Sequence, residues 1–516
     1  MPIPPYTITA KLDVEQIEAL AILPDKRRFF LGDSTGNGKT LSILASAQKL
    51  LAEDPERHIL VIGPKSAYAT WKEQIAEHTT AKAAILTTGE YPEEESTQRH
   101  ITFMTYPMLE DMKEVIAEMY VTHRRKIILI LEEAQYCKNH QKTRSVLVTN
   151  DDGSQKVTRA FTHIREIVAP MVKFSEYCWA MSATPLMNNI TDLYGLFDLL
   201  MPGYLGTEQA FLRYYTIREK RKGKAGHSYW TIVKYQNLSV LKEKISPYIL
   251  KRVREYNVQF FYHKLKLSPV EEGLYLDAAK GILGEEERDF AGRLPDLQRV
   301  VDNAVLGDRE VNRTAGHSTK ERVLLDKLRE QLQAGEGVIV FAEFRDTINR
   351  LEFVLTHAQL PYKRLIRLDA SSSVQDRIAA QQAFGPGILL LMSNVGRESL
   401  NLQAGHIIWM YDIPFSMGSA VQLVGRIARK NSKFDVFEVH IPLTLGTIDE
   451  YKAAMLHHKA DLFRAVLQGE RTMPKSDTLI TREILTKMRK HLLWRCGMSK
   501  RKSKAVAQPT FQWEDI

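Results

Sequence analysis

Cysteine is scarce in this chain of 516 residues, which contains only Cys137, Cys178 and Cys496. These three lie far apart and in no paired spacing, so a disulfide framework and a cysteine zinc site are both excluded. Long apolar runs are also missing, since stretches such as 127–131 and 388–392 are far shorter than the roughly 20 residues that cross a bilayer. The opening MPIPPYTITAKLDVEQ has no basic patch followed by an apolar stretch, so we expect no secretory signal. These absences predict a protein of a reducing, cytoplasmic compartment.

No residue class is extreme in the composition. Hydrophobic residues make up 44% and charged residues 26% of the chain, which excludes a disordered, collagenous or coiled-coil protein. The length corresponds to about three structural units, each large enough to bury a core. The 71 Lys and Arg exceed the 62 Asp and Glu by nine, and this mild excess favours a polyanionic partner.

Short apolar runs alternate with helical patterns in two series, which is typical of parallel sheets covered by helices in an α/β protein. The first series of expected strands lies at 29–32, 58–64, 101–106, 126–131 and 176–183. The second lies at 337–344, 364–370, 387–394, 406–413 and 434–441. Between them the pattern is helical and irregular, without a strand series.

The two series therefore predict two α/β lobes joined by an insertion. The expected divisions are a first lobe over 1–203, a helical protrusion with a basic hairpin and linker over 204–325, a second lobe over 326–469, and a basic tail over 470–516.

The segment Asp33–Thr40 has the sequence DSTGNGKT and lies between an apolar strand and a helical pattern. Glycines let backbone N–H groups face a phosphate, and the helix N-terminus adds partial positive charge. Lys39 would reach the terminal phosphates, and the Thr40 hydroxyl would hold Mg²⁺. Asp33 replaces the first glycine of the usual G-x-x-x-x-G-K-[ST] pattern, with Gly32 one position early. A plain strand–turn–helix connection is the alternative, but the context favours binding of ATP with Mg²⁺.

Acidic residues follow the expected strand at 126–131, in the order Glu132, Glu133, Ala134, Gln135. Such residues are often only solvated turn residues. Beside a phosphate cradle, however, a carboxylate at a neighbouring strand end holds Mg²⁺ and positions water. We expect Glu132 to be the carboxylate on the metal side and Glu133 to orient or deprotonate the attacking water.

Two arginines, Arg426 and Arg429, occur in the second lobe within QLVGRIAR (422–429). They could form a cationic helix face, or act as arginine fingers that neutralise charge on the transferring phosphoryl group. The spacing of three predicts that both lie on one side of a helix.

The order of these motifs resembles that of the Swi/Snf-type DNA translocases within helicase superfamily two, whose core is two RecA-like lobes with ATP between them. Residues 33–40 resemble motif I, 132–139 motif II, 182–189 motif III and 422–429 motif VI. The similarity covers roughly residues 11–469, and the resemblance therefore implies a compact bacterial or phage motor.

The resemblance also implies roles for residues outside the two lobes' central motifs. Gln16 would read adenine, and Gln422 would complete the nucleotide site together with residues of the loop: Gly36, Asn37, Gly38, Lys39 and Thr40. Ser182 and Thr184 would couple hydrolysis to lobe movement. Backbone phosphates of DNA would contact Lys65, Thr105, Ser371 and Ser393.

Three departures from the family pattern stand out. Glu132 replaces the usual aspartate, so the metal contact is one methylene longer and could be made through water. Gln135 replaces histidine in motif II, where we still count it with the catalytic residues, and Ser34 replaces glutamate in motif I. Lys39 and Glu133 remain, so we expect a working ATPase.

Two basic elements could set the preferred DNA. The first lies around Arg221, Lys222 and Lys224, where apolar flanks suggest a hairpin and a solvated loop is the alternative. The second is the tail, where residues 471–504 carry 11 basic residues against two acidic ones. We expect Arg501 and Lys502 of this tail to contact DNA. Its pattern Ile484, Leu485, Met488, Leu492 predicts a folded helix, and Trp494 could be core or a base-stacking platform.

Three functions are compatible with this sequence. The first is a monomeric, DNA-stimulated ATPase that translocates on duplex or branched DNA in replication, recombination or repair, with no membrane partner, in a bacterial or phage-infected cell. The second is a strand-separating DNA or RNA helicase. The third is a DNA-binding scaffold that no longer hydrolyses ATP.

Overall fold

The computed structural model divides the chain into two compact units. The first comprises residues 1–217 and 236–254, and the second 218–235 and 255–516. The structure describes residues 8–34, 36–81, 83–85, 100–138, 144–149, 155–160, 163–183, 190–222, 228–252, 256–283, 290, 292–303, 316–393, 400–414, 417–430, 432–463 and 477–498.

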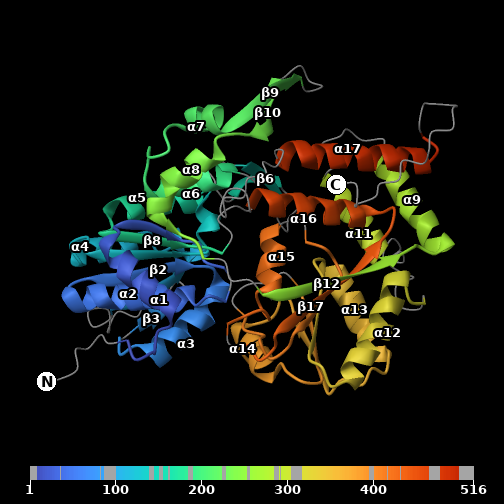
Figure 1. Ribbon diagram of the computed structural model, residues 1–516, viewed down its shortest axis with the longest axis horizontal. Coiled ribbons are helices and arrows are strands. Elements are labelled where there is room, and N and C mark those ends of the chain that lie inside the picture. Colours follow the sequence, from blue (N-terminus) through green and yellow to red (C-terminus); the bar gives the residue numbers. More distant parts are fainter. Residues whose placement is uncertain are drawn as a thin grey trace. The chain divides into compact units, whose positions relative to one another are not determined.

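The first unit is built on a seven-stranded parallel sheet (Figure 1). Its strands, in sheet order, are β11 (Ile249–Leu250), β1 (Arg28–Leu31), β8 (Tyr177–Met181), β5 (Ile127–Glu132), β2 (His58–Gly63), β4 (Ile101–Thr105) and β3 (Ala83–Ile85). Because all strands run in one direction, their carboxyl ends meet at one edge, which is where ligands bind in such sheets.

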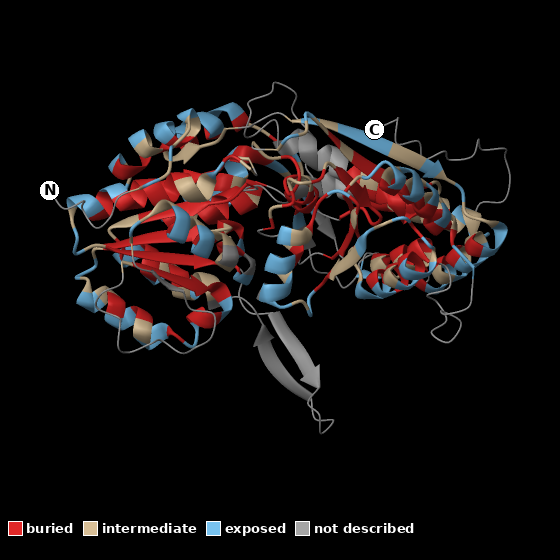
Figure 2. Cartoon of the chain, turned by 90° about the horizontal axis from the view of Figure 1, so that it is seen from below, coloured by how far each residue is buried: buried red, intermediate tan, exposed pale blue. Residues whose placement is uncertain are grey.

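Helices cover both faces of this sheet, so its strands are buried on both sides and appear as continuous apolar runs. One face packs against α1 (Val14–Ile22), α2 (Lys39–Glu53) and α3 (Tyr68–His78), and the other against α4 (Lys113–Thr122), α5 (His163–Phe174) and α6 (Ile190–Leu200). Figure 2 shows the central strands as buried.

The remaining elements of this part are short. They are the helices α7 (Glu208–Tyr215) and α8 (Leu238–Ile245), the antiparallel pair β6 (Arg144–Thr149) and β7 (Gln155–Ala160), and the short 3₁₀ helices η1 (Leu23–Asp25), η2 (Lys65–Ala67), η4 (Tyr106–Leu109), η5 (Ala134–Cys137) and η6 (Ser246–Tyr248). The paired strands β9 (Thr216–Lys222) and β10 (Ser228–Tyr235) follow α7 in the chain, and residues 218–235 of this pair belong to the second unit. The two strands flank residues 223–227, where the sequence analysis expects the turn of a basic hairpin.

The second unit contains a six-stranded parallel sheet. Its order is β12 (Asn257–Leu265), β17 (Val436–Thr444), β16 (Ile407–Met410), β13 (Val338–Phe341), β15 (Ile388–Met392) and β14 (Arg364–Leu368). One face packs against α12 (Thr319–Gln333) and α13 (Arg345–His357), and the other against α14 (Val374–Ala383) and α15 (Met417–Val424). The expectation of two parallel sheets flanked by helices is therefore confirmed.

Four further helices of the second unit form a separate apolar cluster. They are α9 (Pro269–Leu283), α11 (Leu294–Asp302), α16 (Ile448–Phe463) and α17 (Asp477–Arg495). Ile484, Leu485, Met488 and Leu492 of α17 are all buried there. The predicted folded helix in the tail is thus confirmed, and α17 is part of a core.

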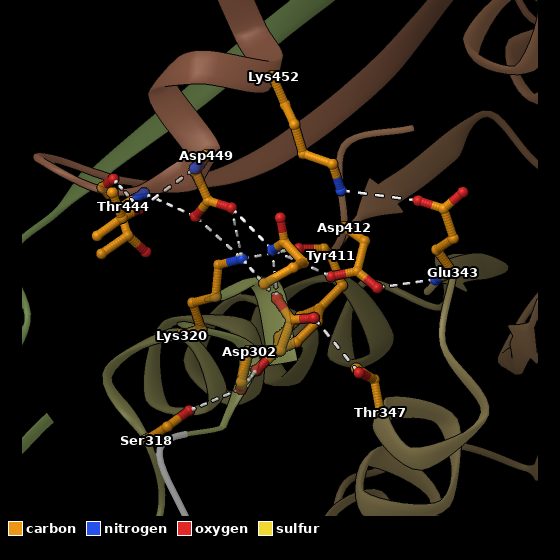
Figure 3. A network of polar contacts seen from close by, with 12 residues as sticks. Asp302, Ser318, Lys320, Glu343, Thr347, Tyr411, Asp412, Thr444, Asp449 and Lys452 are labelled. Atoms are coloured by element: carbon orange, nitrogen blue, oxygen red, sulfur yellow. Dashed lines mark hydrogen bonds and ion pairs between the residues drawn. The ribbon is translucent and has the colours of Figure 1, made fainter. Parts of the chain in front are cut away.

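A buried polar network joins this helical cluster to the sheet (Figure 3). Nζ of Lys320 lies 3.0 Å from a carboxylate oxygen of Asp302 and 3.0 Å from one of Asp449. It also donates to the Tyr411 carbonyl at 3.1 Å. Burial, and the neighbouring Asp412, raise the pKa of Asp302 well above its usual range. Because a buried charge is costly when it loses its partner, this network fixes α11, α12 and α16 relative to β16.

Residues 204–325, expected to be helical and irregular apart from a basic hairpin, also contribute a strand to each main sheet. Strand β11 joins the first sheet, and β12 pairs in parallel with β17 over nine residue pairs. β12 lies at a sheet edge, and half-exposed side chains interrupt its apolar pattern. Edge strands lack the continuous apolar run on which the prediction depended. Within the described part of the chain, no helix is long and apolar enough to cross a membrane.

Gly195 of α6 should not tolerate a side chain. A Cβ placed there would lie 2.1 Å from the backbone carbonyl oxygen of Lys138, just after the acidic motif. We expect Gly195→Ala to lower the unfolding free energy by about 1–3 kcal/mol. The helical glycine Gly273 of α9 has no atom within 4 Å of the same position, so Gly273→Ala should raise stability by about 0.5–1 kcal/mol. Calorimetric unfolding of both variants tests this, and an equal shift in both would contradict it.

Candidate nucleotide site and nucleic-acid interface

The loop between β1 and α2 has the backbone of a phosphate cradle. Gly36 and Gly38 have φ angles of +82° and +69°, in the left-handed region that favours glycine. Gly38 is the N-cap of α2, so the loop leads directly into the positive end of a helix. Asn37 between them is buried. The loop therefore has the left-handed glycines and the helix N-terminus on which the sequence prediction rests.

Lys39 is folded onto its own loop. Its Nζ donates to the carbonyl oxygens of Asp33 at 2.9 Å and Ser34 at 3.0 Å. The ammonium therefore lies at the centre of the cradle, where a phosphate oxygen could take the place of a carbonyl. Thr40 is half-buried in the first turn of α2, so its hydroxyl is at the same helix end.

Gln16 reaches this cradle from α1. Its side-chain oxygen accepts from the Asp13 amide at 2.9 Å within a capping box, which fixes the rotamer. Its Nε2 lies 2.5 Å from the position that a Cβ on Gly38 would occupy. Residues 22 positions apart, chosen from sequence as parts of one site, are therefore in contact at that loop.

Asp33 forms a buried ion pair with Arg252, which sequence reasoning did not foresee. The carboxylate is fully buried and accepts from the Arg252 amide at 2.8 Å, while Arg252 Nε lies 3.1 Å from both carboxylate oxygens. In return, the Ser34 amide donates to the Arg252 carbonyl at 3.1 Å. The partners are 219 positions apart, and no spacing rule connects them.

Lys251 places a second cation beside Lys39. Its Nζ donates to the Ala183 carbonyl at 3.2 Å. Burial, and next the charge of Lys39, lower the pKa of Lys251 to about 7, although Asp33 opposes the shift. Two lysines that repel each other at a helix N-terminus form a site that an anion would stabilise.

The acidic motif at the end of β5 is held in a defined orientation. The Glu132 carboxylate accepts from the Trp71 indole Nε1 at 3.1 Å. Glu133 has a φ of +50°, an uncommon conformation for a residue with a side chain. Gln135 Nε2 donates to the Glu133 carboxylate at 2.7 Å. Gln135, which sequence analysis placed among the catalytic residues, is thus positioned to orient Glu133.

The residues expected to hold Mg²⁺ fit that ion by type. A threonine hydroxyl and a carboxylate are oxygen ligands, which Mg²⁺ prefers in octahedral sites completed by water and phosphate. Thr40 follows β1 and Glu132 ends β5, so both are at the carboxyl edge of the same sheet. The indole contact orients the longer Glu132 side chain.

Other predicted residues of the first unit lie along the same edge. Ser182 is buried after β8, and its amide donates to the Leu31 carbonyl at 3.2 Å. Thr105 is buried at the end of β4, and Lys65 is exposed at the start of η2. Thr184 is outside the described residues.

Arg426 and Arg429 of the second unit share one acceptor. Arg426 Nη1 and Arg429 Nη2 donate to the Leu400 carbonyl at 3.1 and 2.7 Å. Burial, and then the neighbouring Arg426, lower the pKa of Arg429 to about 9. Buried Gln422, on α15, accepts from Arg426 Nε through its carbonyl at 3.0 Å.

The prediction that a helix carries both arginines is wrong, because α15 ends at Val424. Gly425 follows, and the arginines lie in the turns beyond it, where the amides of Arg426 and Ile427 bond three residues back. The two guanidinium groups therefore converge on the Leu400 carbonyl because the chain turns after Gly425, and not because they share a helix face.

The two predicted serines of this unit lie beyond neighbouring strands. Ser371 donates its amide and hydroxyl to Asp369 at 2.8 and 2.5 Å. Burial alone would raise the pKa of Asp369, but the hydrogen bonds from Ser371 and Arg367 lower it to about 2. Ser393 is buried at the end of β15, and its amide donates to Leu368.

Exposed aromatic side chains accompany the basic elements. The Arg218 guanidinium lies 5.5 Å from the ring centroid of Trp230, which is 59% exposed. On α17, Lys487, Lys490 and Trp494 are exposed at helical spacing, opposite the buried residues. Trp494 is 46% exposed, so it is no core residue. The side chains of Arg221 and Lys222, and all of Lys224, Arg501 and Lys502, are outside the described residues.

Two family models together match most of this chain. Residues 16–157 and 166–276 match the SNF2-related domain, and residues 319–431 match the helicase conserved C-terminal domain. An uncharacterized ATP-dependent helicase of Bacillus subtilis is 21% identical, over 95% of this chain and 83% of the relative. An uncharacterized ATP-dependent helicase of Mycoplasma genitalium is 23% identical, over 85% of this chain and 40% of the relative.

This chain therefore spans about two fifths of the length of that Mycoplasma relative. Among solved structures, the Sulfolobus solfataricus SWI2/SNF2 ATPase core in complex with dsDNA is 21% identical, covering 95% of this chain and 98% of that one, with a TM-score of 0.37.

Lys251 should make stability depend on pH. Its pKa of about 7 in the folded state is below the ordinary lysine value of about 10.4. Between these values the unfolded chain binds more protons, so this residue's contribution to stability rises as pH increases from about 7 to 10. Lys251→Met lacks this titration and should be more stable than the parent near pH 6.5, with the difference shrinking toward pH 9.5.

Denaturant unfolding at several pH values measures that difference. Lys72→Met, at an exposed site on α3, is the matched control. A difference between parent and Lys251→Met that stays constant with pH would contradict the assignment.

Proposed function

Because the chain is a Swi/Snf-type member of helicase superfamily two, we propose that it is a DNA-dependent ATPase that couples hydrolysis to translocation on duplex or branched DNA. The observation that carries this proposal is the cradle around Lys39, where loop glycines, a helix N-terminus and two lysines gather at one sheet edge. Such a constellation stabilises the phosphates of a nucleotide. The acidic motif lies at that same edge.

In this proposal the site residues of the first unit act on ATP. Lys39 leaves the carbonyls of Asp33 and Ser34 for the terminal phosphates, and Gln16 contacts the adenine side. Glu133, oriented by the Gln135 amide, takes the proton of the attacking water. Mg²⁺, held by Thr40 and Glu132, would neutralise phosphate charge when bound.

The second unit would contribute Arg426 and Arg429 as arginine fingers. Their shared acceptor, the Leu400 carbonyl, already brings two guanidinium groups together. A phosphoryl group that develops negative charge would relieve their mutual repulsion. Ser182 and Thr184 would transmit the change in nucleotide state to the rest of the motor, as the family resemblance implies.

DNA would be bound mainly through its backbone. Lys65, Thr105, Ser371 and Ser393 would contact phosphates, which carry no sequence information. The basic hairpin and tail would add affinity, with Arg221, Lys222, Lys224, Arg501 and Lys502 as the proposed contacts. Exposed Trp230 and Trp494 would suit unpaired bases at forks or junctions. We therefore propose a monomeric cytoplasmic motor of replication, recombination or repair.

Substitution of the cradle should separate hydrolysis from DNA binding. We expect Lys39→Ala and Glu133→Gln each to lower DNA-stimulated ATP turnover by at least 100-fold, because each removes transition-state stabilisation of roughly 3 kcal/mol or more. DNA affinity should change by less than threefold. Phosphate release with single-stranded, duplex, forked and four-way DNA and with RNA is the measurement.

The parent protein in the same assay distinguishes the three functions considered from sequence. Stimulation by duplex or branched DNA without strand separation supports translocation. Displacement of a labelled strand supports a helicase instead, and background turnover in the parent supports a non-hydrolysing scaffold.

The basic tail can be tested without damaging the core. Deleting the segment after Met498, combined with Lys487→Gln and Lys490→Gln, removes charge but leaves the buried face of α17. DNA affinity should fall, and the slope of log K against log salt should become shallower by about 0.9 for each DNA phosphate that the variant no longer neutralises. Fluorescence anisotropy at several salt concentrations measures the slope.

The control variant neutralises two exposed acidic residues of α12, Asp326 and Glu330. Because acidic residues do not neutralise DNA phosphates, this change should not make the salt slope shallower. A parent-like slope in the tail variant would exclude the tail from the DNA interface.

A further inference from the structure

A cavity of about 650 Å³ lies between α4 and α5 on the first unit. Its apolar lining includes Ile116, Val121, Ile167, Pro170 and Phe174. These helices cover the sheet face opposite α2. None of the lining residues belongs to the nucleotide site or the proposed DNA contacts, so the cavity, here called the α4–α5 pocket, needs its own explanation.

Large apolar side chains at this pocket are exposed. Val121 is 77% and Phe174 is 41% exposed. Pro170, in the interior of α5, is also exposed. An apolar hollow with exposed apolar edges is typical of a surface that binds another molecule.

The rim of the pocket is basic. Lys113, Arg124 and Arg125 line it against a single acidic lining residue, Glu166. Lys113 is itself paired with Glu110 and Arg124 interacts with the charge of Glu56, while both arginine side chains are exposed to a ligand. The Arg125 guanidinium lies 4.7 Å from the ring centroid of Phe174, directly beside the apolar floor.

The backbone that presents these arginines is unusual. Arg124 and Arg125 have φ angles of +48° and +63°, and they are consecutive residues with side chains. Each carries a steric penalty that asparagine or glycine would largely avoid. The turn is closed by hydrogen bonds from their amides to the carbonyls of Val121 at 3.0 Å and Tyr120 at 2.9 Å. Strained backbone conformations are frequent at functional sites. Here the strained turn places the guanidinium groups of Arg124 and Arg125 at the same rim of the pocket.

We propose that the α4–α5 pocket binds an acidic peptide segment of a partner protein, with a bulky apolar side chain of that segment anchored in the cavity. The apolar walls accept the anchor, and Arg124 and Arg125 pair with the carboxylates that flank it. Arginine beside an aromatic ring is a frequent centre of binding energy at protein interfaces. Complementary charge also gives such a site selectivity against basic segments.

Nucleic acid fits this pocket less well. DNA is bound through phosphates along an extended basic groove, whereas the cations here surround an apolar hollow. A segment that combines carboxylates with an apolar anchor satisfies both features at once. The proposal does not depend on ATP hydrolysis.

The test uses a labelled heptapeptide of four aspartates, two leucines and a terminal phenylalanine, titrated with the full chain and followed by anisotropy. We expect saturable binding that weakens as salt increases. A peptide with lysines in place of the aspartates, and one with serines in place of the apolar residues, should each bind at least tenfold more weakly.

Three variants locate the binding. Arg125→Asn removes the charge but tolerates the left-handed backbone, and should weaken binding at least fivefold. Ala117→Phe, at an exposed lining residue, should fill the hollow and weaken binding at least tenfold. Lys72→Glu on α3 changes an exposed charge on the opposite face and should leave binding unchanged.

Basal and DNA-stimulated ATP turnover should be parent-like in all three variants, which also checks folding. Absence of peptide binding to the parent, equal binding of the lysine peptide, equal binding by Ala117→Phe, or displacement of the peptide by stoichiometric duplex DNA would each overturn the proposal. If the parent protein showed no ATP hydrolysis, the proposed motor function would be refuted, but the peptide titrations would still test the pocket.

Discussion

The buried pair of Asp33 and Arg252 is the constraint on which the proposed nucleotide site depends. A carboxylate with no exposure to water requires a partner with good geometry, and Arg252 supplies its amide and its guanidinium. The same contact holds the end of β11 beside the phosphate loop and so brings Lys251 next to Lys39. Asp33 stands where the general phosphate-loop pattern G-x-x-x-x-G-K-[ST] has its first glycine, and the ion pair explains why a charged residue is stable there.

Both units hold like charges together at sites expected to meet phosphate. In the first unit, burial and Lys39 depress the pKa of Lys251, and in the second, burial and Arg426 depress the pKa of Arg429. Backbone carbonyls, those of Asp33, Ser34 and Leu400, meanwhile accept the hydrogen bonds. Such sites cost stability until an anion neutralises them, and in the proposed function the phosphates of ATP would be that anion.

The sequence predicts those parts of the fold that the spacing of apolar residues determines. The central strands are buried on both faces and so appear as continuous apolar runs, whereas edge strand β12 carries half-exposed residues and was missed. The loop after β1 was predictable because Gly36 and Gly38 adopt the left-handed conformation that favours glycine, which marks them in the sequence. Arg252 was not, because a contact across 219 positions leaves no local pattern. The prediction of a helix at Arg426 was wrong because α15 ends at Val424 and the chain turns from Gly425 on.

The departures in motif II become intelligible once their contacts are known. The longer Glu132 side chain is held by the Trp71 indole, which belongs to α3, so the extra methylene does not leave the carboxylate unrestrained. Gln135 donates an amide hydrogen bond to Glu133. Histidine, the usual residue there, changes its charge near neutral pH, whereas an amide donor does not titrate. The orientation of Glu133 should therefore not depend on pH through this contact.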